Sequence, residues 1–270
     1  MVETAGGGLS VEGAYTPDFY AAQASGARAS AEAVVPIACE LVQPASVVDV
    51  GCGTGVWLSV FAEHGILDIQ GYDGEWVKPE DLAIPRSAFA AANLTEPLPT
   101  TRRFDLAVSL EVAEHLPPAH ASHFVSALTQ LSDVVLFSAA IPGQGGTSHL
   151  NEQWPDYWAG EFRARGYEAV DVIRKRIWND ERVKWWYRQN TLLYVATNPL
   201  DPRPQIQELR ARADGIPLRL VHPALYDQTR NAEPAGMSLG TVIRALPRLI
   251  ARAITQRARG RVRGDEEGQG

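Results

Sequence analysis

The 270-residue sequence contains little cysteine and no long apolar run. Its two cysteines, Cys39 and Cys52, are too few for a disulfide framework, so a reducing compartment is expected. No apolar run reaches the length of about 18 residues that a membrane-spanning helix needs. The N-terminus also lacks the basic and apolar regions of a secretory signal. The sequence therefore predicts a soluble cytoplasmic protein.

Positive charge is scarce except in one segment. The formal net charge is −7, yet seven arginines and no acidic residue lie between Thr241 and Arg263, so the remainder carries about −14. This acidic remainder argues against a nucleic-acid partner. Residues 237–259 have the spacing of a basic amphipathic helix, which could lie on an anionic membrane surface or contact a second subunit as a homodimer.

A glycine-rich turn follows a short apolar segment in the stretch VVDVGCGTGVWL, residues 47–58. Gly51, Gly53 and Gly55 come directly after residues typical of a buried strand, and a helical pattern begins at Val56. Glycines at a turn between a strand and a helix let a ligand approach the main chain closely. Val56 occupies the place of the last glycine in a dinucleotide fingerprint, which argues against a nicotinamide enzyme.

This stretch resembles motif I of the class I S-adenosylmethionine-dependent methyltransferases. The resemblance implies that the glycine turn packs against the methionine part of S-adenosyl-L-methionine. It also implies that an acidic residue after the second strand, here Asp73, binds the ribose hydroxyls. Asn93 stands where related enzymes often have an aspartate that binds the adenine amine. The expected cofactor-binding residues are Asp49, Gly51, Cys52, Gly53, Gly55, Asp73, Gly74, Asn93, Leu94 and Glu111.

Strand and helix patterns alternate along the chain, which predicts an α/β protein with a doubly wound sheet. Strands are expected at 47–50, 67–73, 90–94, 104–110 and 134–140, followed by an antiparallel hairpin at 169–177 and 191–197. With the resemblance, this is a Rossmann-like class I methyltransferase fold with seven strands, mostly parallel. We expect a disordered segment at 1–13, a methyltransferase domain with N-terminal lid helices at 14–198, and a C-terminal helical extension at 199–270. Tyr15 and Tyr20 in the lid could line the site or simply pack.

The sequence EVAEHLPP directly follows the fourth expected strand. Its Glu111, Glu114 and His115 are spaced to share one face of a helix. His149 lies in the loop after the fifth strand. Because ligands bind at the carboxyl ends of the strands in open α/β sheets, these four side chains are expected to converge. His64, His120, His123 and His222 are expected at the surface.

The pattern E-x-x-E-H with a later histidine is similar to that of the ubiquinone-pathway O-methyltransferases and the small-RNA 2′-O-methyltransferases. The resemblance implies that Glu111, Glu114, His115 and His149 bind Mg²⁺ or another divalent cation. A bound cation would favour the alkoxide of an attacking hydroxyl. Two alternatives stay open, a metal-free site with His115 or His149 as general base and a purely structural role. The expected catalytic residues are His115, His149 and Glu111.

The second half of the sequence is rich in aromatic residues, with Trp154, Trp158 and the run Trp185-Trp186-Tyr187. Aromatic walls with a few amides suit a ring-shaped acceptor, although such residues can equally fill the core. We therefore expect O-methylation of a hydroxyl on a sugar or secondary metabolite, as in natural-product biosynthesis. The alternatives are an RNA ribose 2′-O-methyltransferase and a non-catalytic scaffold that docks through its C-terminal helix.

Overall fold

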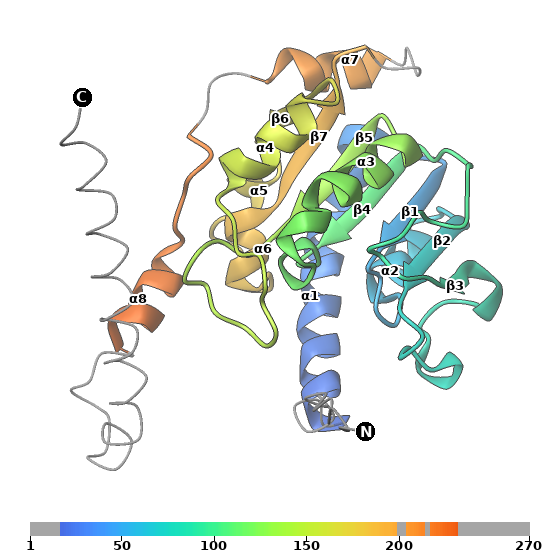
Figure 1. The fold of residues 1–270 in the computed structure, drawn as a ribbon, viewed down its shortest axis with the longest axis horizontal. Coiled ribbons are helices and arrows are strands. Elements are labelled where there is room, and N and C mark those ends of the chain that lie inside the picture. The colour runs from blue at the N-terminus through green and yellow to red at the C-terminus, as the bar shows by residue number, and fades with distance from the viewer. Residues whose placement is uncertain (1–16, 199–203, 214–216, 232–270) are drawn as a thin grey trace, which may run out of the picture. The chain divides into compact units, whose positions relative to one another are not determined.

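The structure is a computed structural model that describes residues 17–198, 204–213 and 217–231 (Figure 1). The chain divides into two compact units, Met1–His222 and Pro223–Gly270, and α8 (Pro223–Asn231) lies in the second. The predicted disordered segment 1–13, Tyr15 and the predicted basic helix 237–259 lie outside the described residues. Within the described ranges, no helix is long and apolar enough to cross a membrane.

A seven-stranded sheet in the order β3-β2-β1-β4-β5-β7-β6 forms the centre of the first unit. β7 pairs antiparallel with β5 and β6, whereas the pairs among β1 to β5 are parallel. The predicted seven-stranded fold with a terminal antiparallel hairpin is therefore confirmed. The strands are β1 (Ser46–Val50), β2 (Asp68–Asp73), β3 (Phe89–Ala91), β4 (Leu106–Leu110), β5 (Val134–Ser138), β6 (Tyr167–Val170) and β7 (Leu192–Ala196).

Helices cover both faces of this sheet (Figure 1). Residues of α1, α2 and α7 belong to one apolar core, and residues of α3 and α4 belong to the other. Every residue of β4, β5 and β7 is buried, as expected for strands enclosed on both faces. The helices are α1 (Pro17–Val42), α2 (Val56–Glu63), α3 (Ala121–Leu131), α4 (Pro155–Arg163), α5 (Arg174–Ile177), α6 (Trp185–Asn190) and α7 (Pro204–Ala211), with 3-10 turns at Pro79–Asp81, Arg86–Ala88, Ala113–His115 and Pro118–His120.

The strand predicted over 169–177 is wrong in its second half. β6 ends at Val170, and α5 begins at Arg174. Arg174 is almost fully buried and pairs with Asp171 at 2.7 Å between Nη2 and Oδ2. An ion pair three residues apart brings the two side chains onto one side of a turn, which an extended strand would not do. The charged residues of this segment therefore mark a turn and a short helix.

Some described residues beyond the predicted domain end at 198 still pack on the first unit, which continues to His222. Ile206 and Leu209 of α7 lie fully inside the core. The prediction of a surface position for His222 is wrong, because its backbone N–H donates to Gln189 Oε1 at 2.8 Å and its ring lies against Trp178. A polar side chain can be buried when its polar groups find hydrogen-bond partners, as those of His222 do.

Candidate active site

The three glycines of the turn after β1 all have left-handed backbone, with φ of 86°, 53° and 81°. A Cβ at Gly51 would overlap the Val112 side chain, and one at Gly55 would lie 2.7 Å from Ile84 Cγ1. A Cβ at Gly53 would meet no atom within 4 Å. Packing therefore requires the first and third glycines, whereas the middle glycine borders open space where a ligand can approach the backbone.

Asp73 ends β2 beside this turn and is buried. Its Oδ2 accepts the N–H of Gly53 at 2.7 Å, and its Oδ1 accepts the N–H of Gly74 at 2.7 Å. Burial raises the pKa of Asp73, and the two backbone hydrogen bonds oppose that rise. A carboxylate that accepts one hydrogen bond per oxygen can still accept a hydroxyl at each, so Asp73 suits a diol such as a ribose.

Asp49 in β1 and Cys52 within the glycine turn are both buried. Burial and the nearby charge of Asp73 raise the pKa of Asp49 well above its usual range. Burial also raises the pKa of the Cys52 thiol, whose Sγ would lie 2.7 Å from a Cβ at Gly71. Cys52 is therefore a protonated packing residue that fits against β2.

Asn93 lies in the loop after β3, which ends at Ala91 and not at the predicted residue 94. Its Oδ1 accepts hydrogen bonds from Thr95 N at 3.1 Å and Thr95 Oγ1 at 2.8 Å, as in an Asx turn. Asn93 is exposed and Leu94 is buried. The adenine contact of Asn93 therefore stays a prediction.

The segment after β4 does not form the predicted helix. Glu111 has φ of 56°, and Ala113–His115 form a 3-10 turn that ends just before Pro117. Proline favours an extended residue before it and cannot continue a helix. Glu111 N donates to Ser138 O at 3.0 Å, which ties this segment to the end of β5. Glu111, Glu114 and His115 therefore do not share one helix face.

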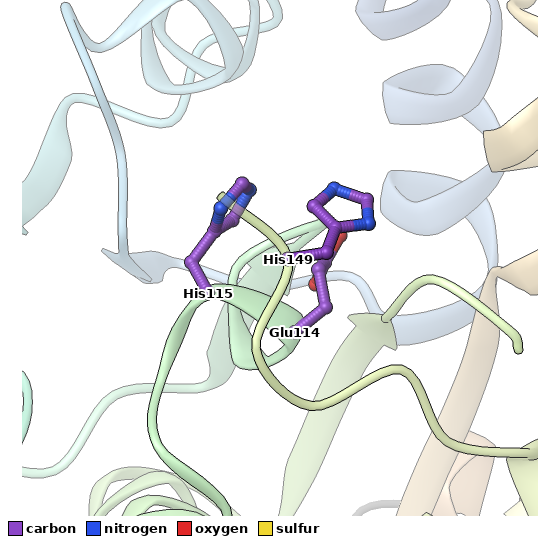
Figure 2. Close-up of side chains that lie close together, drawn as sticks. All are labelled: Glu114, His115 and His149. Atoms are coloured by element: carbon purple, nitrogen blue, oxygen red, sulfur yellow. The ribbon is translucent and has the colours of Figure 1, made fainter. Parts of the chain in front are cut away.

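Glu114, His115 and His149 nevertheless come together (Figure 2). One potential ligand atom from each residue lies within 4.8 Å of the others. The His115 and His149 rings meet edge to face at 4.8 Å between centroids. The backbone holds the two loops together, because Leu150 N and Asn151 N donate to Glu114 O at 2.7 and 2.9 Å. The predicted convergence is thus observed for three of the four residues.

The Glu114 carboxyl group is completely buried, and neither of its oxygens makes a hydrogen bond of good geometry. Burial and the charge of Glu111 raise the pKa of Glu114 well above its usual range, although the backbone of Glu114 and of Ala140 lies close enough to lower that pKa slightly. His115 remains exposed, and partial desolvation together with the charge of His149 lowers its pKa. The group therefore combines a costly buried carboxyl with two imidazole rings.

Glu152 orients the His149 ring through a contact of 3.0 Å between Oε1 and Nδ1. The same carboxylate accepts the N–H groups of Gly143 and Gly145 at 2.8 and 3.0 Å. Burial raises the pKa of Glu152, but the bonds from His149 and these two glycines outweigh it and leave the pKa below its usual value. A carboxylate bound to a ring nitrogen fixes the orientation of a histidine.

Glu111 lies outside the group of three. Its carboxylate accepts Gln144 Nε2 at 2.8 Å and Asn190 Nδ2 at 3.1 Å. Burial raises the pKa of Glu111, and the bond from Asn190 opposes that rise. Sequence reasoning gave no role to Gln144, although an amide between the apolar end of β5 and a glycine pair is a signal for a buried hydrogen bond.

Two of the aromatic residues of the second half, Trp158 and Tyr187, pack in the core. Trp158 is buried in the core on the α4 face. Tyr187 of α6 meets Trp57 of α2 edge to face at 5.2 Å between ring centroids, so it joins α6 to the helix after the glycine turn. Trp158 therefore fills the core, and Tyr187 positions α6.

Comparison with known proteins gives a family. A family profile described as "Methyltransferase domain" matches residues 20–172. The chain belongs to the class I S-adenosylmethionine-dependent methyltransferases. No curated protein matches the sequence. The family implies S-adenosyl-L-methionine as cofactor, and the open space at Gly53 beside Asp73 fits that methyltransferase cofactor.

Solved structures similar to this methyltransferase share its fold at low identity. The sugar N-methyltransferase KedS8 from Streptoalloteichus sp. is 17% identical, with 73% of this chain and 100% of that chain covered and a TM-score of 0.52. CalS10, an amino pentose methyltransferase from Micromonospora echinaspora, is 16% identical (68% and 98% covered, TM-score 0.48). The methyltransferase domain of a bacterial Hen1 is 18% identical (63% and 98% covered, TM-score 0.46).

Proposed function

We propose that this methyltransferase methylates a hydroxyl oxygen of a small molecule such as a sugar or secondary metabolite. In this proposal Glu114, His115 and His149 bind a divalent cation that activates the hydroxyl. The observation that carries the proposal is the buried Glu114 carboxyl, whose two oxygens have no well-formed hydrogen bond while two imidazoles lie within 4.8 Å. Burying a carboxyl group without such partners costs free energy, and a bound cation would offset that cost.

The chemistry of the three ligands suggests which cation would fit. Imidazole suits Zn²⁺ and Fe²⁺, whereas carboxylate suits Mn²⁺ and Mg²⁺. Two imidazoles and one carboxylate therefore favour a transition metal such as Mn²⁺, Fe²⁺ or Zn²⁺ over Mg²⁺. Three protein ligands also leave coordination positions for acceptor oxygens.

The same group of residues favours oxygen over nitrogen as the methylated atom. The names of the similar structures include a sugar N-methyltransferase and an O-methyltransferase family protein, so the fold does not choose between them. An alcohol has a pKa far above neutrality, and a cation or base must lower the cost of its deprotonation. An amine needs much less help, so the costly buried Glu114 would serve little purpose with an amine acceptor.

In this proposal, different residues of the chain bind the cofactor and the acceptor. S-adenosyl-L-methionine, when bound, supplies an electrophilic methyl group. Asp73 and the glycine turn would bind the cofactor, while Glu114, His115 and His149 would bind and orient the acceptor oxygen. The lowered pKa of His115 favours its neutral imidazole, which is the form that binds a cation. Alignment of the two reacting atoms would supply much of the rate enhancement.

The experiment is a transfer assay with the full-length protein, in which release of S-adenosylhomocysteine is measured for a panel of acceptors. The panel contains sugars with free hydroxyls, phenolic metabolites, matched amino sugars and an RNA oligonucleotide. Each acceptor is tested with Mn²⁺, with Mg²⁺ and with a chelator. Glu114→Gln is compared with Glu181→Gln, a matched change at an exposed glutamate.

The proposal predicts turnover of a hydroxyl acceptor with Mn²⁺, and its loss in chelator and in Glu114→Gln but not in Glu181→Gln. Equal turnover in chelator would overturn the cation and leave His115 or His149 as a metal-free base. Turnover of amino sugars alone would overturn O-methylation. Turnover of RNA alone would favour the ribose 2′-O-methyltransferase instead.

A further inference from the structure

A network of amide side chains connects His222, the last residue of the first unit, with the Glu111 carboxylate. His222 N donates to Gln189 Oε1 at 2.8 Å. Gln189 Nε2 donates to Asn190 Oδ1 at 3.0 Å and to Gln144 Oε1 at 3.3 Å. Asn190 and Gln144 then donate to the two Glu111 oxygens at 3.1 and 2.8 Å. Hydrogen bonds thus run without a break from residue 222 to the end of β4.

The direction of this network is fixed by backbone donors. The His222 backbone N–H can only donate, so an amide oxygen must face it. If the Gln189 amide were reversed, its NH₂ group would face the His222 N–H and its oxygen would face Gln144 Oε1. Gln144 Oε1 also interacts with Ile141 N at 3.2 Å, which fixes that amide as well. The network therefore directs amide N–H groups at both oxygens of Glu111.

Residues 217–222, here called the strap, are anchored by a buried guanidinium. Arg174 donates to Leu218 O at 3.0 Å and to Pro217 O at 3.3 Å, and it pairs with Asp171. The same side chain donates to Gln189 O at 3.3 Å. One buried arginine thus joins the strap to the end of α6, where the amide network begins. Charged hydrogen bonds in a buried place are among the stronger ones.

The sheet order suggests what Glu111 faces. β2, β1 and β4 lie side by side, with Asp73 at the end of β2, the glycine turn after β1 and Glu111 after β4. If Asp73 binds the ribose of a cofactor that crosses the turn, the other end of the cofactor lies toward β4. Each Glu111 oxygen accepts one amide N–H and keeps capacity for a further donor, such as the ammonium group of the cofactor.

We propose that Gln189 is a positioning residue for the cofactor site, through which the strap fixes Glu111 against the amino-acid end of S-adenosylmethionine. This inference rests on the proposed place of Glu111 in the cofactor site. Gln189 is fully buried and each of its polar atoms has a partner, so it transmits the position of the strap without contacting the cofactor itself.

The test is a pair of calorimetric titrations of the full-length Gln189→Met protein. The first ligand is S-adenosylhomocysteine. The second is 5′-methylthioadenosine, which has the same nucleoside and sulfur but no amino-acid end. Methionine has a similar volume and makes no hydrogen bond, so the amides of Gln144 and Asn190 that hold Glu111 lose their link to the strap. Binding of S-adenosylhomocysteine should weaken about fivefold to tenfold, while binding of 5′-methylthioadenosine stays unchanged.

Arg219→Ala is the matched control within the strap. Arg219 pairs with Asp156 at the surface and makes no bond to the amide network, so neither affinity should change. Equal weakening of both ligands in Gln189→Met would mean general loosening and would overturn the inference, as would no change in either. If Gln189→Met fails to fold, Gln189→Glu replaces it, because it keeps the acceptor for His222 N and supplies at most one donor. The same selective loss is expected.

Glu111→Gln separates this inference from the assignment of Glu111 to the cofactor site. If Glu111→Gln leaves S-adenosylhomocysteine binding unchanged, Glu111 does not belong to the cofactor site, and the inference fails with that assignment. If Glu111→Gln weakens this binding and the Gln189 variants do not, the assignment of Glu111 stands and the role of the strap is overturned.

Discussion

The proposed cofactor half and the proposed acceptor half of the site are built from different groups. In the cofactor half, backbone groups dominate, because the glycine turn and the N–H groups of Gly53 and Gly74 surround Asp73. In the acceptor half, side chains from a 3-10 turn and a long loop meet at Glu114 and His149. Backbone geometry that depends on strand register can be recognised in a short motif, whereas convergence of side chains depends on how two loops fold.

If the two halves are separate, a substitution in the acceptor half should largely abolish methyl transfer without loss of cofactor binding. His149→Ala removes one of the two imidazoles beside Glu114. Turnover should fall by about a hundredfold or more, as expected for the loss of acid–base or metal assistance. The measurement is the rate of S-adenosylhomocysteine release on an accepted substrate. His123→Ala, at an exposed histidine of α3, is the control and should keep its turnover.

Within the cofactor half, the first and second glycines should behave differently. Gly51→Ala places a methyl group against Val112 in left-handed backbone, and should lower the free energy of unfolding by about 2 kcal/mol. Gly53→Ala meets no atom, so its cost is limited to the backbone strain of about 1 kcal/mol. Denaturant unfolding measures both. Equal losses in the two variants would contradict the packing described at this turn.

Gly53→Ala should nevertheless weaken cofactor binding, because its methyl group enters the open space of the turn. This effect should be visible in a titration with S-adenosylhomocysteine even where the fold is kept. Full affinity in Gly53→Ala would mean that the cofactor does not approach the turn there.

A smaller effect concerns the buried carboxyl groups of the cofactor half. Burial raises the pKa of Asp49 above its value of about 3.9 in an unfolded chain. Between these two pKa values the folded state binds more protons, so stability is present at low pH and is lost as the pH rises through the folded pKa. Asp49→Asn should therefore raise the melting temperature of the ligand-free protein at pH 8 and flatten its pH dependence. An unchanged pH dependence would contradict the charge burial at Asp49.

The difference between the cofactor half and the acceptor half also explains which features could be predicted from the sequence. The glycine turn and the strand that ends at Asp73 were predictable, because strand–turn–helix patterns depend on neighbouring residues. The seven-stranded arrangement was predictable only from the resemblance to class I methyltransferases. The helix expected at Glu111 was wrong, since Pro117 and the left-handed Glu111 allow only a 3-10 turn. The separation of Glu111 from the other three residues depends on Gln144 and Asn190, which are far apart in the sequence. No local pattern brings such amides together.

The burial of His222 was missed for the same reason. Its partners Gln189 and Trp178 lie in segments that are brought to the strap by tertiary packing. The turn at Arg174 was not predicted, because Arg174 and Asp171 form a buried ion pair and charged residues in a sequence usually indicate the surface. A polar residue is buried where the fold brings hydrogen-bond partners to it, so its residue type alone does not predict its burial.

The separation of the two halves is tested most directly by one calorimetric comparison. S-adenosylhomocysteine and Mn²⁺ are titrated, each in turn, into the His115→Ala/His149→Ala double variant and into Asp73→Asn. The double variant should bind S-adenosylhomocysteine like the unaltered protein but should no longer bind Mn²⁺. Asp73→Asn should lose about tenfold in S-adenosylhomocysteine affinity and keep its Mn²⁺ binding. Loss of S-adenosylhomocysteine affinity in the double variant would contradict the account, because the histidines would then belong to the cofactor half.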